Sequence, residues 1–553
     1  MRNFLLGLMA GVTLAVVASF SAGYYWLRRA ERSPAVPARA TLVLRISGNV
    51  PEKQPFELVW PGNPATALTT FGVWDSLRKA AADGRIEALV VQPEGVSAGW
   101  ATLAEIRDSI LAFGKSGKPV TAFLSGPSAR DYYLASAAGR ITMPPGDVLN
   151  LKGLRAELLY ARGALDKLGI TPEFEAIGKY KDGADALTRR AMSAETREVM
   201  NEILDQRFAD LVGAIAAGRS KTAEQVRALI DEGPFLAEDA VGKGLVDATA
   251  YRDEALPPAE AGRRVMAADY QRVPALSLRL SGPQRIAYLT AEGDIFRSAI
   301  PGVTDEILEP DAFGKLVREI AEDTRIRAVV LRIDSPGGDA IASDEMLREL
   351  KLLAKKKPLV VSMADVAASG GYALAMAGVR IVAYRQTITG SIGVFFGKLN
   401  LTGLYGKLGI EKQILARGRF SAIDSDARAL TPEERAKLRR SLEQVYGTFV
   451  RQVAEGRKRP VAEIEPLAEG RVWLGSQAQA NGLVDSLGGI SLALSVAKKE
   501  AGIADAAQVE IEVYPRRPGI REVLEKRPWE LVWSRAMPAP LLWKRLPYGI
   551  EVR

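Results

Sequence analysis

Ser369 is the residue in this sequence whose surroundings best suit nucleophilic chemistry. It lies in the run Ala-Ala-Ser-Gly-Gly-Tyr, after an apolar segment and before a short apolar stretch with helical character. Because its neighbours are small, a substrate carbonyl could reach the hydroxyl oxygen, and the backbone N–H of Gly370 could stabilise the resulting oxyanion. The alternative is that Ser369 only caps the following helix, which is a common role for serine.

Two further turns contain glycine and polar residues. The run Asp-Ser-Pro-Gly-Gly, which ends with Gly337 and Gly338, follows a predicted strand and precedes a predicted helix. Adjacent glycines can adopt positive φ and present bare N–H groups, which at a helix start can hold a developing negative charge. The run Thr-Gly-Ser-Ile-Gly contains Ser391. Each run, taken alone, is weak evidence, because most runs of this kind are ordinary turns.

The composition restricts the partners that a serine nucleophile could have. The sequence contains no His and no Cys. A Ser-His-Asp triad, a thiolate nucleophile and His- or Cys-ligated zinc are therefore excluded, and a general base must be Lys, Asp, Glu or Tyr. We expect no cofactor and no metal. The formal charge of +8 is modest and spread along the chain, so we expect no nucleic-acid partner.

The chain repeats itself at a nearly constant spacing. Ile86–Val91 (Ile-Glu-Ala-Leu-Val-Val) matches Ile326–Leu331 (Ile-Arg-Ala-Val-Val-Leu), 240 positions later. Tyr132–Ile141 matches Tyr372–Ile381 at the same offset. This repetition predicts two homologous domains, at residues 40–268 and 285–505, between an N-terminal segment (1–32) and a C-terminal tail (506–553).

Each half alternates β-branched runs with helical patterns, which predicts an α/β fold class. Ala328–Ile333 and Leu359–Met363 read as buried strands. Helical spacing covers residues 344–355, 186–217 and 432–455. The tail, with its tryptophans and basic residues, is expected to pack on the second domain, or alternatively to rest on lipid.

The N-terminal segment predicts a membrane anchor. The run from Phe4 to Leu27 contains no charged residue, and it is long enough to cross a bilayer. A cleaved signal peptide is the competing interpretation, although the apolar stretch is long for one. Arginines are more numerous after this segment than before it, which by the positive-inside rule favours a cytoplasmic body.

Together, the three serine- and glycine-containing runs, in this order and spacing, resemble the signal peptide peptidase A (protease IV) family, peptidase family S49, in its long two-domain form. The resemblance implies two tandem Clp protease/crotonase-like domains and a Ser-Lys dyad. It makes Ser369 the nucleophile and Lys181, in Gly-Lys-Tyr-Lys, the general base. Ser391 matches the serine that orients this lysine. Gly338 and Gly370 match the oxyanion donors, with Gly337 beside them as a further candidate.

The repeat supports this division of roles. At the offset of 240, Ser369 falls on Ala129, and Lys181 falls on Ser421. Ser391 and Gly338 likewise fall on residues that cannot replace them, Leu151 and Ala98. Each half therefore lacks what the other retains, as expected if one composite site lies where the two domains meet.

A lysine can act as the base if burial lowers its pKa from about 10.4 toward neutrality, because the ammonium form loses more solvation than the amine. Two neighbours could interfere with Lys181. Asp182 would raise the pKa of the lysine if it pointed inward, and we expect it to point outward. Lys179 could compete for the role, because both lysines would face the same side of a strand.

The resemblance implies a membrane-anchored serine endopeptidase that degrades released signal peptides and other hydrophobic peptides. It further implies a homotetramer in the bacterial inner membrane with its body on the periplasmic side, in disagreement with the arginine count. Two alternatives remain: an acyl-CoA enzyme of the crotonase type, which would leave Lys181 without a role, and a non-catalytic scaffold.

Overall fold

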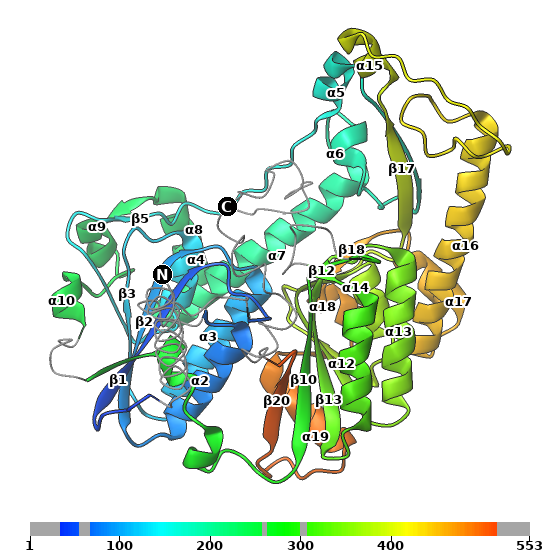
Figure 1. The fold of residues 1–553 in the computed structure, drawn as a ribbon. Coiled ribbons are helices and arrows are strands. Elements are labelled where there is room, and N and C mark those ends of the chain that lie inside the picture. Colours follow the sequence, from blue (N-terminus) through cyan, green and yellow to red (C-terminus); the bar gives the residue numbers. More distant parts are fainter. Residues whose placement is uncertain (1–33, 55–66, 257–262, 299–306, 517–553) are drawn as a thin grey trace, which may run out of the picture.

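Two α/β domains lie side by side in the computed structural model, which describes residues 34–54, 67–256, 263–298 and 307–516 (Figure 1). The α/β class with two tandem domains is thus confirmed. The run from Phe4 to Leu27, predicted to be a membrane anchor, lies outside these residues. Within the described ranges, no helix combines the length and the apolar character needed to span a membrane.

The first domain is built on a parallel sheet with the strand order β8-β4-β3-β2-β1-β9. Its central strands are rich in leucine and valine and are buried, which is typical of parallel sheets covered by helices. The strands of this sheet are β1 (Ala40–Gly48), β2 (Ile86–Val96), β3 (Val120–Phe123), β4 (Arg140–Met143), β8 (Ala248–Thr249) and β9 (Arg264–Met266). The other elements are α2 (Thr70–Ala82), α3 (Trp100–Gly114), α4 (Ala129–Ala135), α6 (Asp185–Thr188), α7 (Ala194–Arg219), α8 (Ala223–Glu232), α9 (Ala237–Gly242), α10 (Arg252–Ala255), α11 (Ala267–Tyr270), η2 (Ala275–Leu278) and the pair β5 (Val148–Leu149) and β7 (Phe235–Leu236).

The second domain repeats this plan with the order β18-β16-β14-β13-β10-β20, and β15 pairs with both β14 and β19. All pairs are parallel except β16 with β18. The strands are β10 (Arg285–Glu292), β13 (Ile326–Ser335), β14 (Leu359–Ala368), β15 (Arg380–Ala383), β16 (Ile388–Gly390), β18 (Val472–Leu474), β19 (Ser486–Leu487) and β20 (Glu510–Tyr514), with the small pair β11 (Asp294–Ile295) and β12 (Ile307–Leu308) beside them. The helices are α12 (Pro310–Glu322), α13 (Ala340–Ala354), α14 (Gly370–Ala375), α16 (Pro432–Arg457), α17 (Val461–Ile464), η3 (Glu465–Leu467), α18 (Gly475–Ala480) and α19 (Ile490–Glu500).

Two sequence-based expectations about these elements were wrong. The helix predicted over residues 186–217 is interrupted, because Ser193 adopts an extended backbone and its side chain accepts the N–H of Thr196, which starts α7 anew. The second domain also extends beyond residue 505. The first part of the predicted tail forms β20, which pairs in parallel with β10 and therefore belongs to the sheet.

A two-stranded arm joins the domains. β6 (Thr171–Ile177) of the first domain pairs antiparallel with β17 (Val394–Asn400) of the second. With α5 (Arg162–Leu168) and α15 (Thr402–Leu408), this arm projects from the body at the upper right of Figure 1. The chain that leaves β6 leads directly to Lys181, so the arm ties the predicted base to the second domain.

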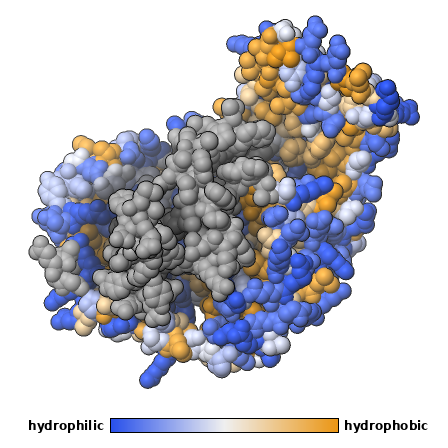
Figure 2. Space-filling view, in the orientation of Figure 1, coloured by the Kyte–Doolittle hydropathy of each residue, from blue (hydrophilic) through white to orange (hydrophobic). Residues whose placement is uncertain are grey.

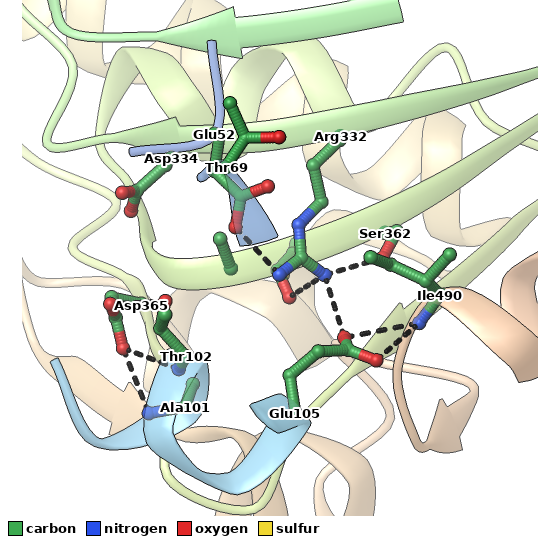
Figure 3. A network of polar contacts seen from close by, with 12 residues as sticks. Glu52, Thr69, Ala101, Thr102, Glu105, Arg332, Asp334, Ser362, Asp365 and Ile490 are labelled. Carbon is green, nitrogen blue, oxygen red and sulfur yellow. Dashed lines mark hydrogen bonds and ion pairs between the residues drawn. The ribbon is translucent and has the colours of Figure 1, made fainter. Parts of the chain in front are cut away.

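A buried ion network lies where the domains meet (Figure 3). Arg332, on β13, is fully buried. Its guanidinium donates to Glu52 at 2.8 Å, to Ser362 at 2.9 Å and to Glu105 at 3.4 Å. Because Glu52 and Glu105 belong to the first domain, separating the domains would leave this charge without its buried partners, which is costly.

The two domains also cap each other's helices. Asp365 of the second domain accepts the N–H groups of Ala101 and Thr102, at 2.8 and 3.0 Å, at the start of α3. Glu105 of the first domain accepts the N–H of Ile490, at 3.1 Å, at the start of α19. Helix N-termini carry unpaired N–H groups and partial positive charge, so each domain stabilises a helix end of the other.

Glycines leave room for the two carboxylates that cap these helices. A Cβ on Gly99 would lie 2.2 Å from Cγ of Asp365, and one on Gly489 would lie 2.2 Å from Oε2 of Glu105. A side chain at either position would displace the capping carboxylate. The docking of the domains is therefore set by specific polar contacts as well as by apolar packing.

Candidate active site

Ser369 occupies a strained turn between β14 and α14. Its φ of 52° and ψ of −120° lie in a region that non-glycine residues rarely adopt. Its N–H donates to Gly390 and its carbonyl accepts from Ala373, at 2.8 and 2.9 Å, which holds the turn on both sides. The hydroxyl makes no capping hydrogen bond to α14. The alternative in which Ser369 serves only as a helix cap is therefore wrong.

Lys181 of the first domain reaches this serine across the junction. Its Nζ lies 3.2 Å from Oγ of Ser369. It also lies 3.0 Å from Oγ and 3.1 Å from the carbonyl oxygen of Ser391. The structure thus brings together the three side chains that the sequence proposed as nucleophile, base and orienting residue.

Burial changes the acid-base properties of Lys181. Loss of solvation lowers the pKa of its amine from 10.5 to about 8, and the charge of Asp182 opposes this shift. Asp182 is exposed, and its carboxylate accepts the hydroxyl of Thr196 at 3.0 Å. Among the described residues it forms no ion pair with Lys181. A substantial fraction of the amine is therefore neutral near pH 8 and can accept a proton.

Lys179 has a different environment. Its side chain is 59% exposed and lies 3.4 Å from the carboxylate of Glu469. Its ammonium also lies over the ring of Tyr180, 5.1 Å from the centroid. The two lysines therefore do not share a face: Lys179 is solvated, and only Lys181 enters the site.

The loop that carries Lys181 fits against the second domain through glycines. Gly178 has a φ of +109°, and a Cβ there would lie 2.3 Å from the carbonyl carbon of Glu469. Gly470 has a φ of +77°, and a Cβ there would lie 2.6 Å from Cβ of Lys181. The N–H of Tyr180 donates to Glu469 at 2.9 Å. This close backbone contact determines how far Lys181 extends toward Ser369.

The oxyanion candidates lie beside the serine. A Cβ on Gly337 would lie 2.5 Å from the backbone N of Gly370 and 2.9 Å from Cβ of Ser369. Gly338 forms an isolated β-bridge with Ile295. The N–H of Ile295 donates to the carbonyl of Gly337, and the carbonyl of Ile295 accepts the N–H of Asp339, so the N–H of Gly338 takes no part in the bridge. Within the described part of the chain, no group accepts the N–H of Gly338 or of Gly370. Both donors are therefore available to a substrate oxygen. The further candidate, Gly337, is not, because its N–H donates to Oγ of Ser335 at 3.2 Å.

The corresponding turn of the first domain has lost these properties. Ala129 takes the place of Ser369, and the preceding Ser128 forms an ordinary capping box with Asp131. In the second domain, Ser421 takes the place of Lys181, and its hydroxyl donates to its own turn at Gly418. The described residues thus contain one such serine–lysine pair. They contain no group of three or more acidic residues placed to hold a metal ion.

Sequence reasoning missed two residues that contact the site. Gly470 and Arg471, which precede β18, contact the Lys181 loop and Ser391. They are distant from both in the sequence and belong to no recognisable motif. The glycine itself is the only signal in the sequence, and a single glycine is usually just a turn residue.

Comparisons with known proteins found similar sequences that span both domains. The model of peptidase family S49 matches residues 112–266 and 351–504, once in each domain. Protease 4 of Salmonella typhi is 31% identical over 472 residues, which cover 82% of this chain and 75% of that protein. Protease 4 of Haemophilus influenzae is 29% identical over 521 residues, which cover 88% and 82%.

A plant relative is also similar. Serine protease SPPA, chloroplastic, of Arabidopsis thaliana is 36% identical over 443 residues, which cover 77% of this chain and 64% of the relative. The family model covers more than half of the chain, and the bacterial relatives match it across both domains. This chain belongs to peptidase family S49, a family of serine proteases.

Proposed function

We propose that this protein is a membrane-anchored serine endopeptidase that cleaves released signal peptides and other hydrophobic peptides with a Ser369–Lys181 dyad. The observation that carries the proposal is the 3.2 Å contact between Nζ of Lys181 and Oγ of Ser369. Family membership supports the chemistry. The anchor and the substrate class rest on the N-terminal apolar run and on the family resemblance.

Each group has a defined part in the reaction. Oγ of Ser369 attacks the peptide carbonyl carbon while its proton passes to the neutral amine of Lys181. The N–H groups of Gly370 and Gly338 stabilise the negative oxygen. The lysine ammonium then protonates the leaving amine, and water repeats the sequence on the acyl-enzyme to release the acid. Ser391 holds the lysine by its hydroxyl and carbonyl oxygens.

Active-site labelling tests this proposal. A fluorophosphonate probe should label the wild-type protein on Ser369 at a rate that rises with pH, and the Ser369→Ala variant should remain unlabelled and should not hydrolyse a hydrophobic fluorogenic peptide. Thermal unfolding of both proteins controls for folding, because the substitution removes one oxygen at a site that tolerates small residues. Hydrolysis by Ser369→Ala at more than a few per cent of the wild-type rate would contradict the nucleophile assignment.

The location of the protein is a separate proposal. We infer that residues 4–27 anchor the chain once in the bacterial inner membrane, with the body on the periplasmic side. Retention in membranes after carbonate washing, together with digestion of the body by protease added to spheroplasts, would support it. If the body were protected, the arginine distribution would have predicted the orientation correctly.

We further infer that the protein forms a homotetramer, and the arm supports a head-to-tail contact. In β6 and β17, each domain contributes one strand to the pair. At the repeat offset of 240, their counterparts are residues 411–417 and 154–160. Residues 411–417 are exposed and belong to no described strand. In our proposal, residues 154–160 of a second copy pair with them as β17 pairs with β6. This is a heterologous contact, which gives a ring when the rotation between successive copies closes.

Exposed apolar side chains on the segment that follows α15 of the arm favour such a contact. Leu415 is 94% exposed and Ile410 is 48% exposed. Apolar residues gather on the arm in the space-filling view (Figure 2), and patches of this kind mark interaction surfaces. Leu415→Asp should therefore lower the mass of the detergent-solubilised protein in light scattering. Leu276→Asp, at a site that is 73% exposed on η2, is the control. A monomeric wild-type protein would refute the tetramer.

A further inference from the structure

Arg471 lies between the catalytic groups and the domain junction. It precedes β18 in the second domain and is 8% exposed. A buried arginine requires partners for its charge, and the partners of Arg471 come from the other domain.

The guanidinium binds α7 of the first domain at two points. It donates to Glu198 at 2.6 Å and to both carboxylate oxygens of Glu202 at 2.9 Å. Charge-assisted bonds of this kind are short and directional, and the planar fork of arginine fixes their geometry. Arg471 thus connects β18 rigidly to the helix that follows the Lys181 loop.

The same guanidinium lies between two aromatic rings. Its central carbon is 4.8 Å from the ring centroid of Tyr180 and 4.6 Å from that of Trp473. Tyr180 directly precedes Lys181, and its hydroxyl donates to Glu198 at 3.4 Å. Stacking on Tyr180 therefore restrains the backbone from which the base projects.

The main chain of Arg471 reaches the other side of the site. Its carbonyl oxygen accepts the N–H of Ser391 at 2.7 Å. Ser391 in turn contacts Nζ of Lys181 through its hydroxyl and carbonyl oxygens. Arg471 is therefore linked to the base by two independent routes, Tyr180 on one side and Ser391 on the other.

We propose that Arg471 is a positioning residue that fixes Lys181 relative to Ser369 and Ser391 by clamping the two domains at the Lys181 loop. The proposal rests on the proposed Ser369–Lys181 function. In this role Arg471 does not contact the substrate. Its effect is on the orientation of the base and on the exclusion of water around it.

Several charged groups surround Lys181 and must be considered in any pH experiment. Asp182 lies on its own loop with Lys179, and Glu469 lies on the segment that precedes Gly470. Arg471 follows on that segment, and Glu198 and Glu202 lie on α7. Removing Arg471 deletes one positive charge and loosens the loop, so that water enters. Both changes favour the ammonium form of Lys181.

The experiment measures kcat and KM against pH for Arg471→Met and Arg471→Lys, with a hydrophobic fluorogenic peptide. For Arg471→Met, kcat should fall roughly 10- to 100-fold, the scale expected when a catalytic group is misplaced by about 1 Å. KM should change less than about twofold, and the midpoint of the pH profile should rise by roughly half a unit or more. Arg471→Lys keeps the charge but lacks the planar fork, so it should restore the activity only in part.

Arg457→Met is the matched control. The side chain of Arg457 is 10% exposed, as is that of Arg471, and it binds Asp485 at 2.7 Å, but both partners belong to the second domain. Arg457→Met should lose about as much stability as Arg471→Met, but the midpoint of its pH profile should stay at the wild-type value. If Arg471→Met fails to fold, Glu202→Gln gives the test. Glu202 is only half-buried, so this variant should fold. It weakens the clamp and should shift the midpoint of the pH profile upward by a smaller amount.

The outcomes separate this inference from the proposed function. If the wild type titrates near pH 8 and the folded Arg471 and Glu202 variants keep both its midpoint and its kcat, Arg471 has only a structural role and the inference is overturned. If Lys181→Ala remains fully active in the same assay, the Ser-Lys function itself has failed. An upward midpoint with lower kcat and unchanged KM supports the clamp.

Discussion

Nζ of Lys181 lies 3.2 Å from Oγ of Ser369, although 188 positions separate the two residues in the chain and each belongs to a different domain. The contact exists because the two copies of a duplicated fold dock with the Lys181 loop of one against the Ser369 turn of the other. A site of this kind depends on the domain interface as much as on its own residues. The following predictions test both parts.

Lys181→Ala should reduce kcat/KM by on the order of 10²–10⁴-fold, because it removes the general base. Lys179→Ala is the matched control: its side chain is 59% exposed and pairs with Glu469, so its loss should change the rate less than about threefold. Steady-state hydrolysis of a fluorogenic peptide measures both. An inactive Lys179→Ala beside an active Lys181→Ala would reverse the assignment.

The pH profile should reflect the depressed pKa of Lys181. Only the neutral amine accepts the proton from Ser369, so kcat/KM should rise with pH through a midpoint of about 8. Asp182 raises the pKa of Lys181 through its charge. Asp182→Asn should therefore move the midpoint downward while retaining an acceptor for Thr196. A midpoint that moved upward would mean that Asp182 acts otherwise than through its charge.

Gly337→Ala should impair catalysis by obstructing the oxyanion site. The added Cβ would lie 2.5 Å from the N of Gly370, so that donor could not reach a substrate oxygen. The loss of one donor costs about 10²–10³-fold in kcat. Gly502→Ala controls for backbone strain, because Gly502 also has a positive φ of +68° but open space around it. It should lose about 1 kcal/mol of stability and no activity. Equal activity of the two variants would exclude this oxyanion site.

Glu105 should make the stability of the protein fall as pH rises. Burial raises its pKa from 4.5 to about 7, although Arg332 and the N–H of Ile490 oppose the shift. Between pH 4.5 and about 7, Glu105 therefore keeps its proton in the folded state but has lost it in the unfolded state. The free energy of unfolding is highest below pH 4.5 with respect to this group, and that contribution is lost as the pH rises to about 7. The contribution is about 3 kcal/mol at most.

Glu105→Gln should remove this part of the pH dependence. Denaturant unfolding of the wild type and the variant at pH values from 4.5 to 8 measures the difference, in which other titrating groups cancel. Glu157→Gln, at a side chain that is 70% exposed, should leave the curve unchanged. Parallel curves for the wild type and Glu105→Gln would show that Glu105 ionises normally in the folded state.

The family resemblance implied that Lys181 is the base. From its own patterns the sequence predicted the α/β class, the duplication and Ser369 as a candidate nucleophile. These features depend on local patterns: periodic apolar residues determine strands and helices, and small residues around Ser369 create an accessible turn. The same local reasoning erred at two element boundaries. The helix predicted over 186–217 is broken before Ser193, whose side chain caps a new helix. The first part of the predicted tail forms β20, because it pairs with β10, a strand far away in the sequence.

The family resemblance implied Lys181 rather than Lys179 as the base, and only the tertiary structure shows how differently the two side chains are placed. The two lysines are two residues apart, and the pattern placed them on one face, but the loop turns after Gly178 and directs only Lys181 into the junction. The lowered pKa of Lys181, the two unused N–H groups and the contacts of Gly470 and Arg471 likewise arise between segments far apart in the chain. Such contacts depend on how two complete domains dock, and the apolar packing, buried charges and exchanged helix caps at the interface come from segments far apart in the sequence.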